Sequence, residues 1–271
     1  MKQNTNKELS IQVSLNGLSF CILNRSTNTI EYLNKIDFQS KLTPFDALHR
    51  LKTELSASAV FSDEFRTVTV THQNELSTVV PKSLYDERQK VDYLKFNAKI
   101  LKTDYITHDE ISINNSVNVY IPYVNINNYI FDTFGEFVYK HSSTLLIETI
   151  LGEDQASDKS KIFINVNKMT LEVLVVHNGK LQLFNSFEYH SKEDFIYYVL
   201  FVFEQLQLDV ESMPVILSGL IDKDDKLFNI LYTYVRHVSI VESNYNYKFS
   251  DVVTDQKRYE LHHYYLILNS F

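Results

Sequence analysis

Two runs of three short strands, one near the start of the chain and one in its second half, limit what this sequence can fold into. The first run occupies residues 9–38 and the second residues 161–188. Apolar and polar residues alternate over parts of both runs, which is the period-two pattern of a half-buried strand. Each run also contains an Asn-Gly pair, the strongest two-residue signal for a β-hairpin, at Asn16-Gly17 and at Asn178-Gly179. Each run is therefore predicted to form three consecutive strands joined by tight turns.

Alternating helical and strand patterns follow each run. Helices are predicted where apolar residues recur every three or four positions, and strands where they alternate or form a short continuous stretch. After the first run, the predicted elements are a helix at 44–58 capped by Thr43, strands at 67–71 and 78–80, a helix at 83–96, strands at 103–107 and 117–121, a helix at 126–140 and a strand at 143–150. After the second run, they are a helix capped by Ser191, a strand at 214–218, a helix at 224–234, a strand at 235–241 and a closing helix at 259–268.

This order of elements occurs twice, with insertions in the first copy, and so indicates an internal duplication. Right-handed crossovers place the helices on the faces of the sheets. Residues 152–160 are polar and lack periodicity, which is typical of a loop or linker. We therefore predict an α/β protein with two lobes, residues 1–151 and residues 161–271, and a cleft between them.

Three stretches of sequence resemble those of a known family. They are LSIQVSLNGLSFCILN at residues 9–24, VVPKSLY at residues 79–85 and VYIP at residues 119–122. Together with the order of elements, they make the chain similar to an uncharacterised bacterial family of about this length. For that family a fold of the actin-like ATPase type is expected and no activity is established. The resemblance covers nearly the whole chain and implies two ribonuclease-H-like lobes, with mixed sheets flanked by helices and an interlobe cleft.

Active members of the actin-like ATPase superfamily bind phosphate at the first hairpin turn of each lobe. There, an Asp positions Mg²⁺ or water, and a Gly two residues later lets backbone N–H groups approach the phosphates. The resemblance places the corresponding turns at residues 14–19 and 165–170. The candidate cleft residues are Ser14, Asn16 and Gly17 in the first turn and Asn165, Asn167, Lys168 and Thr170 in the second.

The expected carboxylates are absent from both turns. Asn165 stands where the second-lobe Asp would be, Asn167 stands where its Gly would be, and the glycine pair that contacts nucleotide is reduced to Ser218-Gly219. An amide is a weaker ligand than a carboxylate for a hard divalent cation, and it cannot act as a general base. The resemblance therefore implies a vestigial nucleotide cleft with no catalytic residue and no cofactor, although Asn-Gly and Asn-x-Asn are also ordinary turn sequences.

The composition excludes several classes of function. A net charge of −8 disfavours binding to nucleic acid or to an anionic membrane, and only 5 glycines argue against a Gly-rich phosphate loop. The single Cys21 rules out an intramolecular disulfide and a multi-cysteine zinc site. The first residues lack the apolar segment of a secretory signal, and no stretch of ~18 apolar residues could span a membrane. A cytoplasmic location is expected.

Other polar clusters are given structural interpretations. His262 and His263 lie beside Glu260, but adjacent helical side chains point about 100° apart, so the two histidines are not expected to share a metal ion. The segment Asp222-Lys223-Asp224-Asp225 could bind a cation, but its acidic residues are expected instead to satisfy the N–H groups and the macrodipole at the start of a helix. The sequence FIYYVLFVF at residues 195–203 carries more apolar surface than one packing stripe needs, and aromatic residues are enriched at protein interfaces.

Three functional hypotheses follow from the sequence. The leading one is a non-catalytic actin-like protein that binds an unknown protein partner or acts as a scaffold. The second is an ATP-binding switch or weak ATPase, in which Lys168 neutralises phosphate in place of Mg²⁺. The third is an α+β interaction domain without a cleft. The sequence does not identify the partner or the oligomeric state.

Overall fold

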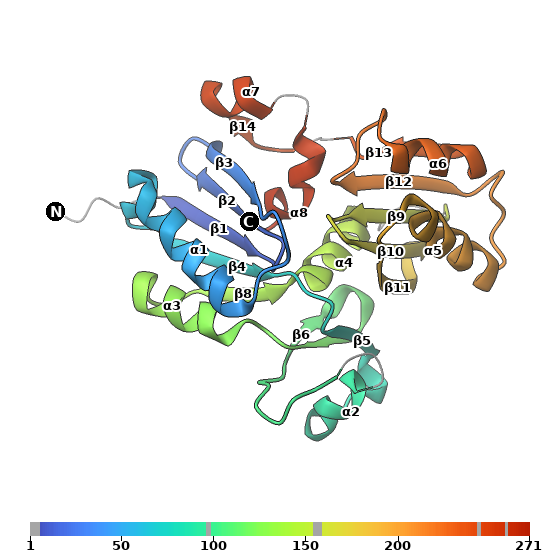
Figure 1. Cartoon of the computed structure of the whole chain (residues 1–271), viewed down its shortest axis with the longest axis horizontal. Coiled ribbons are helices and arrows are strands. Elements are labelled where there is room, and N and C mark those ends of the chain that lie inside the picture. The colour runs from blue at the N-terminus through green and yellow to red at the C-terminus, as the bar shows by residue number, and fades with distance from the viewer. Residues whose placement is uncertain (1–5, 96–98, 154–158, 243–244, 258–259) are drawn as a thin grey trace.

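The fold consists of two large sheets and one small sheet, with helices between and around them (Figure 1). A computed structural model of the chain describes residues 6–95, 99–153, 159–242, 245–257 and 260–271. Within these residues the large sheets have six and five strands, and the small sheet has three. The α/β class predicted from the sequence is confirmed.

The six-stranded sheet is built on the first of the two strand runs. Its order is β14-β3-β2-β1-β4-β8, in which β1 to β3 are antiparallel neighbours while β4 and β8 extend the sheet in parallel. The strands are β1 (Lys7–Val13), β2 (Gly17–Asn24), β3 (Thr29–Asp37), β4 (Thr67–His72), β8 (Val138–His141) and β14 (Lys248–Phe249). Helices α1 (Pro44–Ala57) and α3 (Val124–Phe134) pack their apolar residues on this sheet, followed after α1 by the short helix η1 (Ala59–Ser62).

The five-stranded sheet is built on the second run, in the order β11-β10-β9-β12-β13. Its strands are β9 (Lys161–Val166), β10 (Thr170–His177), β11 (Lys180–Glu188), β12 (Pro214–Gly219) and β13 (His237–Ile240). β12 lies between two parallel neighbours, as its continuous apolar sequence predicts. Helices α5 (Lys192–Gln205) and α6 (Lys226–Tyr234) share one apolar core with this sheet.

The small sheet, in the order β5-β7-β6, projects from the body of the molecule (Figure 1). Its strands are β5 (Ser77–Pro81), β6 (Thr107–Ile111) and β7 (Ser116–Tyr120). Short helical segments accompany it, namely η2 (Lys82–Leu84), η3 (Glu87–Gln89), α2 (Lys90–Leu94) and η4 (Ser112–Asn114). The long helix predicted at 83–96 is therefore wrong over its described part, and residue 96 lies outside the described residues. The strand predicted at 103–107 is also displaced, because β6 begins only at Thr107.

A buried helix replaces the strand predicted at residues 143–150. Helix α4 (Ser142–Glu153) lies between the five-stranded sheet and the small sheet, and its apolar residues pack against both. A helix that is buried on almost all sides has no polar face, so its sequence reads as a continuous apolar run that resembles a buried strand. The loop predicted at 152–160 begins inside this helix, and residues 154–158 lie outside the described residues.

Two further elements end earlier, or are shorter, than predicted. The helix predicted at 126–140 stops at Phe134, because Gly135 takes a positive φ of 81°, and residues 138–141 form strand β8 instead. The closing helix predicted at 259–268 is divided into η5 (Leu261–Tyr264) and α8 (Tyr265–Leu268), and residue 259 lies outside the described residues.

The last part of the chain returns to the six-stranded sheet. Strand β14 pairs with β3, and Val253 of helix α7 (Asp251–Lys257) shares an apolar cluster with residues of β2, β3 and α8. The division into lobes at residues 1–151 and 161–271 stays a prediction. Within the described part of the chain, no helix has both the length and the apolar character to cross a membrane.

Candidate functional site

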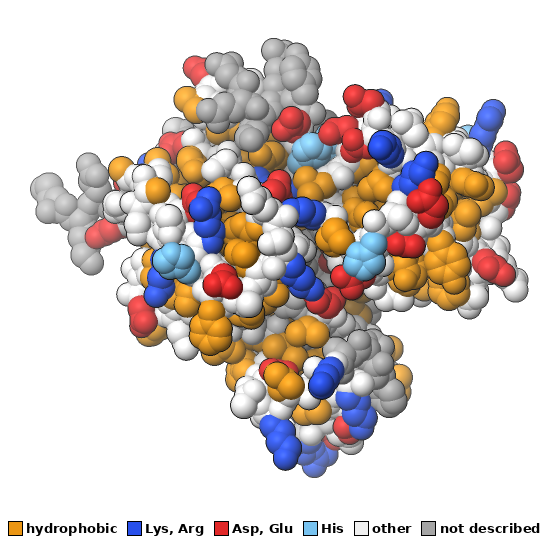
Figure 2. Space-filling model, viewed as in Figure 1, with side chains coloured by type: hydrophobic (Ala, Val, Ile, Leu, Met, Phe, Trp, Pro, Cys, Tyr) orange, Lys and Arg blue, Asp and Glu red, His pale blue; other side chains and the backbone are white. Residues whose placement is uncertain are grey.

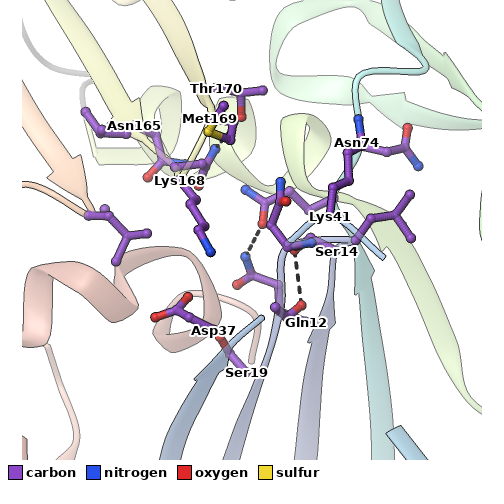
Figure 3. Close-up of a pocket in the computed structure, with 18 of the residues that line it drawn as sticks. Gln12, Ser14, Ser19, Asp37, Lys41, Asn74, Asn165, Lys168, Met169 and Thr170 are labelled. Carbon is purple, nitrogen blue, oxygen red and sulfur yellow. Dashed lines mark hydrogen bonds between the residues drawn. The ribbon is translucent and has the colours of Figure 1, made fainter. Parts of the chain in front are cut away.

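A cavity of about 410 Å³ lies between the two large sheets and brings together the turns singled out in the sequence (Figure 3). Its lining includes Ser14, Asn16, Gly17, Asn165, Asn167, Lys168, Thr170 and Gly219. Ser218 is fully buried and is not part of the lining. Because residues from both large sheets line this cleft, the hypothesis of a domain without a cleft is wrong.

The two turns that face each other across the cleft have the same hydrogen-bonding pattern. In the first, the backbone N–H of Ser14 donates to the carbonyl oxygen of Gly17 at 3.0 Å, and in the second Asn167 donates to Thr170 at 2.8 Å. The Oγ atom of Ser14 also accepts from the N–H of Asn16 at 3.1 Å. These three N–H groups are thus satisfied inside their own turns.

Asn165 is the centre of a buried polar network under the second turn. Its amide nitrogen donates to Oε2 of Glu172 at 2.8 Å, and its amide oxygen accepts from Oγ of Ser218 at 3.0 Å. Asn167 donates to the same Glu172 oxygen at 3.3 Å. Both polar ends of the Asn165 side chain therefore have protein partners, which leaves this amide poorly placed to bind a cation.

Glu172 is a buried carboxylate that the sequence analysis did not single out. It lies on β10 directly opposite Asn165 on β9, and only 4% of its surface is exposed. Burial raises the pKa of Glu172, while hydrogen bonds from neutral amide and hydroxyl groups act in the opposite direction. The available sequence signal was a single charged residue within the apolar run LEVLVV at residues 171–176.

The strand register shows which residue of the first sheet corresponds to Asn165. Asn165 lies opposite Glu172 and beside Ser218, whereas Gln12 on β1 lies opposite Ser19 and beside Thr71. Gln12 lines the cleft and donates from Nε2 to Oε1 of Gln73 at 2.8 Å. An amide side chain thus occupies this register position in both sheets, and the sequence analysis had overlooked Gln12.

Two lysines that line the cleft, Lys168 and Lys41, already have partners within the protein. Nζ of Lys168 reaches across the cleft and donates to the carbonyl oxygens of Phe38 and Gln39. Lys41 forms an ion pair with Glu75 at 2.8 Å. A phosphate group could recruit Lys168 only by displacing its contacts with the loop after β3.

Gly219 brings the end of β12 against the second turn. It has a positive φ of 81°, and a Cβ atom at this position would lie 2.2 Å from the carbonyl oxygen of Val166. A side chain is therefore excluded on two grounds, backbone conformation and space. The chain then turns so that Asp222, three residues later, faces helix η5.

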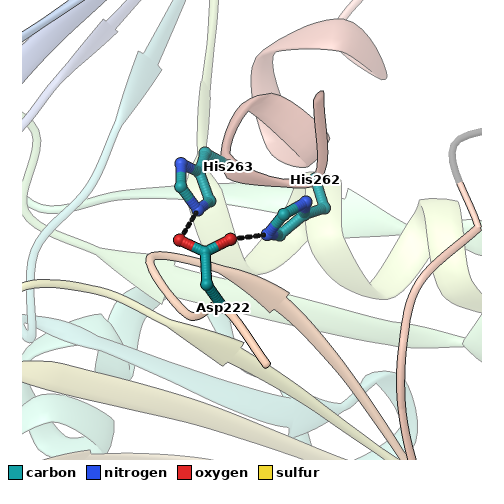
Figure 4. Close-up of side chains that lie close together, drawn as sticks. All are labelled: Asp222, His262 and His263. Carbon is teal, nitrogen blue, oxygen red and sulfur yellow. Dashed lines mark ion pairs between the residues drawn. The ribbon is translucent and has the colours of Figure 1, made fainter. Parts of the chain in front are cut away.

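Asp222, His262 and His263 form a compact cluster (Figure 4). Oδ1 of Asp222 lies 3.1 Å from Nε2 of His262, and Oδ2 lies 3.2 Å from Nε2 of His263. The expectation that the two histidines diverge is wrong, since their ring centroids are 4.4 Å apart. The Nε2 atom lies at the far end of the imidazole, so side-chain rotation brings the two nitrogens together from different backbone directions.

The expected role of the Asp222–Asp225 segment in capping a helix is also not seen. Asp225 is the N-cap residue of α6, but its side chain makes no capping hydrogen bond within the helix. Its Oδ2 atom instead accepts from the backbone N–H of Asp222 at 2.9 Å. This contact holds the short loop in place and orients Asp222.

Comparisons with known proteins bear out the fold. The family model described as "Protein of unknown function (DUF3822)" matches residues 1–238. No curated protein sequence matches the chain. A protein of unknown function with an actin-like ATPase fold from Bacteroides thetaiotaomicron VPI-5482 superposes with a TM-score of 0.78 at 24% identity, covering 88% of this chain and 91% of that one. The PilM-PilN type IV pilus biogenesis complex superposes with a TM-score of 0.63 at 12% identity, covering 97% of each chain. The chain thus has the actin-like ATPase fold predicted from its sequence.

Proposed function

The chain belongs to the DUF3822 family, whose function is unknown, and from the state of its cleft we propose that it is a non-hydrolysing actin-like protein. In this proposal its nucleotide cleft is degenerate, and the protein acts in the cytoplasm by binding another protein. The observation that carries the proposal is the buried network of Asn165, Glu172 and Ser218. In this proposal Asn165, a neutral amide whose nitrogen and oxygen both have protein partners, occupies the position where catalytic relatives would need a carboxylate.

The two turns support the same conclusion. Phosphate binding at such turns requires backbone N–H groups that point toward the ligand. The N–H groups of Ser14, Asn16 and Asn167 are already hydrogen-bonded within the turns. Lys168 is bound to carbonyl oxygens across the cleft.

We also propose that the two lobes, residues 1–151 and 161–271, arose by internal duplication. The shared pattern of turn hydrogen bonds and the equivalent registers of Gln12 and Asn165 support this proposal. If the two positions are equivalent, the carboxylate is missing from both lobes. Loss of both metal-binding carboxylates favours binding over hydrolysis.

The aromatic surface of α5 supports a role in protein binding. Tyr197 is 62% exposed and stacks on Phe201, which is 38% exposed. Hydrophobic side chains also gather on the face of the molecule that includes α5 and β11 (Figure 2). Exposed aromatic residues are enriched at protein interfaces. The PilM-PilN structure is a complex of two proteins on a similar fold, so a protein partner is a reasonable expectation here.

The absence of nucleotide binding can be tested by thermal unfolding with millimolar ATP, with and without Mg²⁺. A ligand at ~100 times its Kd adds about 2.7 kcal/mol, which corresponds to a shift of roughly 5 °C or more in a chain of this size. We expect no shift and no release of phosphate. A clear shift that Lys168→Ala weakens, and that the exposed control Lys192→Ala leaves unchanged, would favour the ATP-binding switch instead.

The protein-binding half of the proposal can be tested on α5. A tagged chain expressed in its native cells should retain a specific partner, and the double variant Tyr197→Ser, Phe201→Ser should lose it. The control is Lys192→Ala on the same helix. Equal retention by the double variant would exclude this surface.

A further inference from the structure

We propose that Asp222, His262 and His263 bind one divalent transition-metal ion of the Zn²⁺ class at the edge of the interlobe cleft. This inference goes beyond the proposed function, because the site does not involve the turns or the partner surface. The three side chains each offer one ligand atom, and these atoms all lie within 4.8 Å of one another. No other group of three or more such residues is found among those that the structure describes.

The distances are close to those of a metal site. With metal–ligand distances of about 2.0–2.1 Å, neighbouring ligand atoms in a tetrahedral Zn²⁺ site lie about 3.3 Å apart. The Asp222 oxygens are 3.1 Å and 3.2 Å from the two histidine nitrogens. In Figure 4 the carboxylate lies between the two imidazoles, and both Nε2 atoms point toward it. Because the three ligand atoms all lie within 4.8 Å of one another, side-chain rotations would have to bring the most distant pair closer to direct them at one ion.

The buried Nε2 atom of His263 is a second observation that points to a bound ion, independent of the distances within the cluster. Its Nε2 atom is buried and lies 3.2 Å from Oδ2 of Asp222, but the two atoms are not aligned for a hydrogen bond, and no other group among the described residues forms one with this nitrogen. A buried polar atom without a hydrogen bond is costly, and a bound ion would satisfy this nitrogen.

Metal binding by His262 requires the proton on its Nε2 atom to leave that nitrogen. Its Nε2 atom lies 2.9 Å from the carbonyl oxygen of Ile221, so in the metal-free protein Nε2 carries the proton and donates to that oxygen. To bind a metal through Nε2, His262 must lose this proton or carry it on Nδ1. The Ile221 carbonyl is then free of its donor and offers a further oxygen beside the ion.

The ligand set determines which ions are expected. Two imidazoles and one carboxylate suit Zn²⁺, Co²⁺, Ni²⁺ or Fe²⁺, whereas Mg²⁺ and Ca²⁺ prefer sites made of oxygen ligands. Three protein ligands leave a fourth position for water or another ligand. Because His263 also lines the cleft, an ion here would connect the loop after β12 and helix η5 at the cleft edge.

The experiment uses the full chain after treatment with EDTA. One titration adds Zn²⁺ and is followed by calorimetry, and a second adds Co²⁺ and is followed by visible absorption. We expect one Zn²⁺ per chain, a tetrahedral Co²⁺ spectrum and at least 100-fold weaker binding of Mg²⁺. Asp222→Asn and His263→Ala should each weaken Zn²⁺ binding by at least ~100-fold, since even loss of an outer-shell partner costs 10–100-fold. The matched control is His49→Ala, an exposed histidine on α1.

Asp222→Asn keeps the shape of the side chain, so it tests the site even if His263→Ala impairs folding. Failure of the wild-type chain to bind Zn²⁺ or Co²⁺ would overturn the proposal. Zn²⁺ binding that survives both substitutions would overturn it as well, because the ion would then lie elsewhere. Equal binding of Mg²⁺ and Zn²⁺ would refute the assignment to a site with two imidazoles.

Discussion

Replacing Asn165 with Asp would restore the residue type expected of a catalytic relative, and we predict that it destabilises this protein. The substitution puts a carboxylate oxygen where the amide nitrogen now lies, 2.8 Å from Oε2 of Glu172. Two buried carboxylates would then face each other, and the hydrogen bond from Asn165 to Glu172 would be lost. The variant therefore tests whether this network requires a neutral side chain at position 165.

The size of the effect is limited by proton uptake. A lost hydrogen bond to a charged group costs about 1.5–3 kcal/mol, and two charges ~4 Å apart at an effective dielectric constant of ~20 repel by about 4 kcal/mol. The pair can avoid both costs by binding one proton, which bridges the two groups. Protonating a carboxyl group with the ordinary pKa of about 4.3 costs about 3.7 kcal/mol at pH 7. Because binding this proton removes both penalties, about 3.7 kcal/mol is the upper limit of the stability lost at pH 7. At pH 5 the same limit is about 1 kcal/mol.

The sign of the pH dependence follows from the raised pKa of the pair. The folded variant binds a proton at this pair more tightly than the unfolded chain does, so the pair's contribution to stability is fully present below about pH 4 and is lost as the pH rises. Urea unfolding of wild type and Asn165→Asp at pH 5 and pH 7 measures this directly. We expect the loss to be about 3–3.7 kcal/mol at pH 7 and up to about 1 kcal/mol at pH 5.

The control is the same substitution in a Glu172→Gln background. There the second carboxylate is gone, and the Gln amide can donate to the new carboxylate at position 165, so most of the loss at pH 7 should disappear. An Asn165→Asp variant as stable as wild type at pH 7 would refute the reasoning. So would a loss of equal size at both pH values, or one that persists with Glu172→Gln.

Further predictions concern turns, caps and buried histidines. Gly219→Ala should destabilise the fold by more than Gly135→Ala, measured by urea unfolding, because both have a φ of 81° but only Gly219 lacks space for a Cβ atom; equal losses would contradict this. Ser191→Ala should cost about 1 kcal/mol through loss of the capping box of α5, and an unchanged unfolding midpoint would argue against it. Burial lowers the pKa of His72 to about 4 and of His141 to about 3, so the stability that depends on their neutral forms is complete above about pH 6.5 and is lost as the pH falls. Each histidine should change the free energy of unfolding, measured by urea unfolding, by up to about 1.4 kcal/mol per pH unit between pH 6 and pH 4, and His72→Gln should reduce this slope. A slope that His72→Gln leaves unchanged would contradict the conclusion that His72 is buried in its neutral form.

Features that depend on neighbouring residues were predicted well. Asn178-Gly179 forms the expected hairpin turn with positive φ angles of 50° and 67°. Ser191 caps α5 as predicted, and together with Asp194 it forms a capping box. In each case a few adjacent residues contain all the atoms that make the interaction, so sequence is sufficient.

Features that depend on burial were predicted less well. Helix α4 was taken for a strand because a neighbour on nearly every side removes the polar face that marks a helix. The candidate site shows the same limit. The turn residues were identified through the family resemblance, whereas Glu172 and Gln12 were missed because their importance lies in the residues opposite them in the sheet.

By itself, the sequence determined the hairpin turn at Asn178-Gly179, most strands and the absence of a carboxylate from the two cleft turns, because these depend on residue identity and short-range geometry. The Asn-Gly turn predicted at Asn16-Gly17 is wrong, because Gly17 already belongs to β2 and neither residue has a positive φ. The tertiary structure decided which side chains meet. It joined Asn165 to Ser218 and Glu172, and it brought Asp222 against His262 and His263. Asn165 and Ser218, like Asp222 and the two histidines, lie far apart in the chain, while Asn165 and Glu172 meet only through the register of two neighbouring strands. The geometry of these contacts is set by strand register and by the packing of the helices on the sheets, which no local pattern in the sequence records.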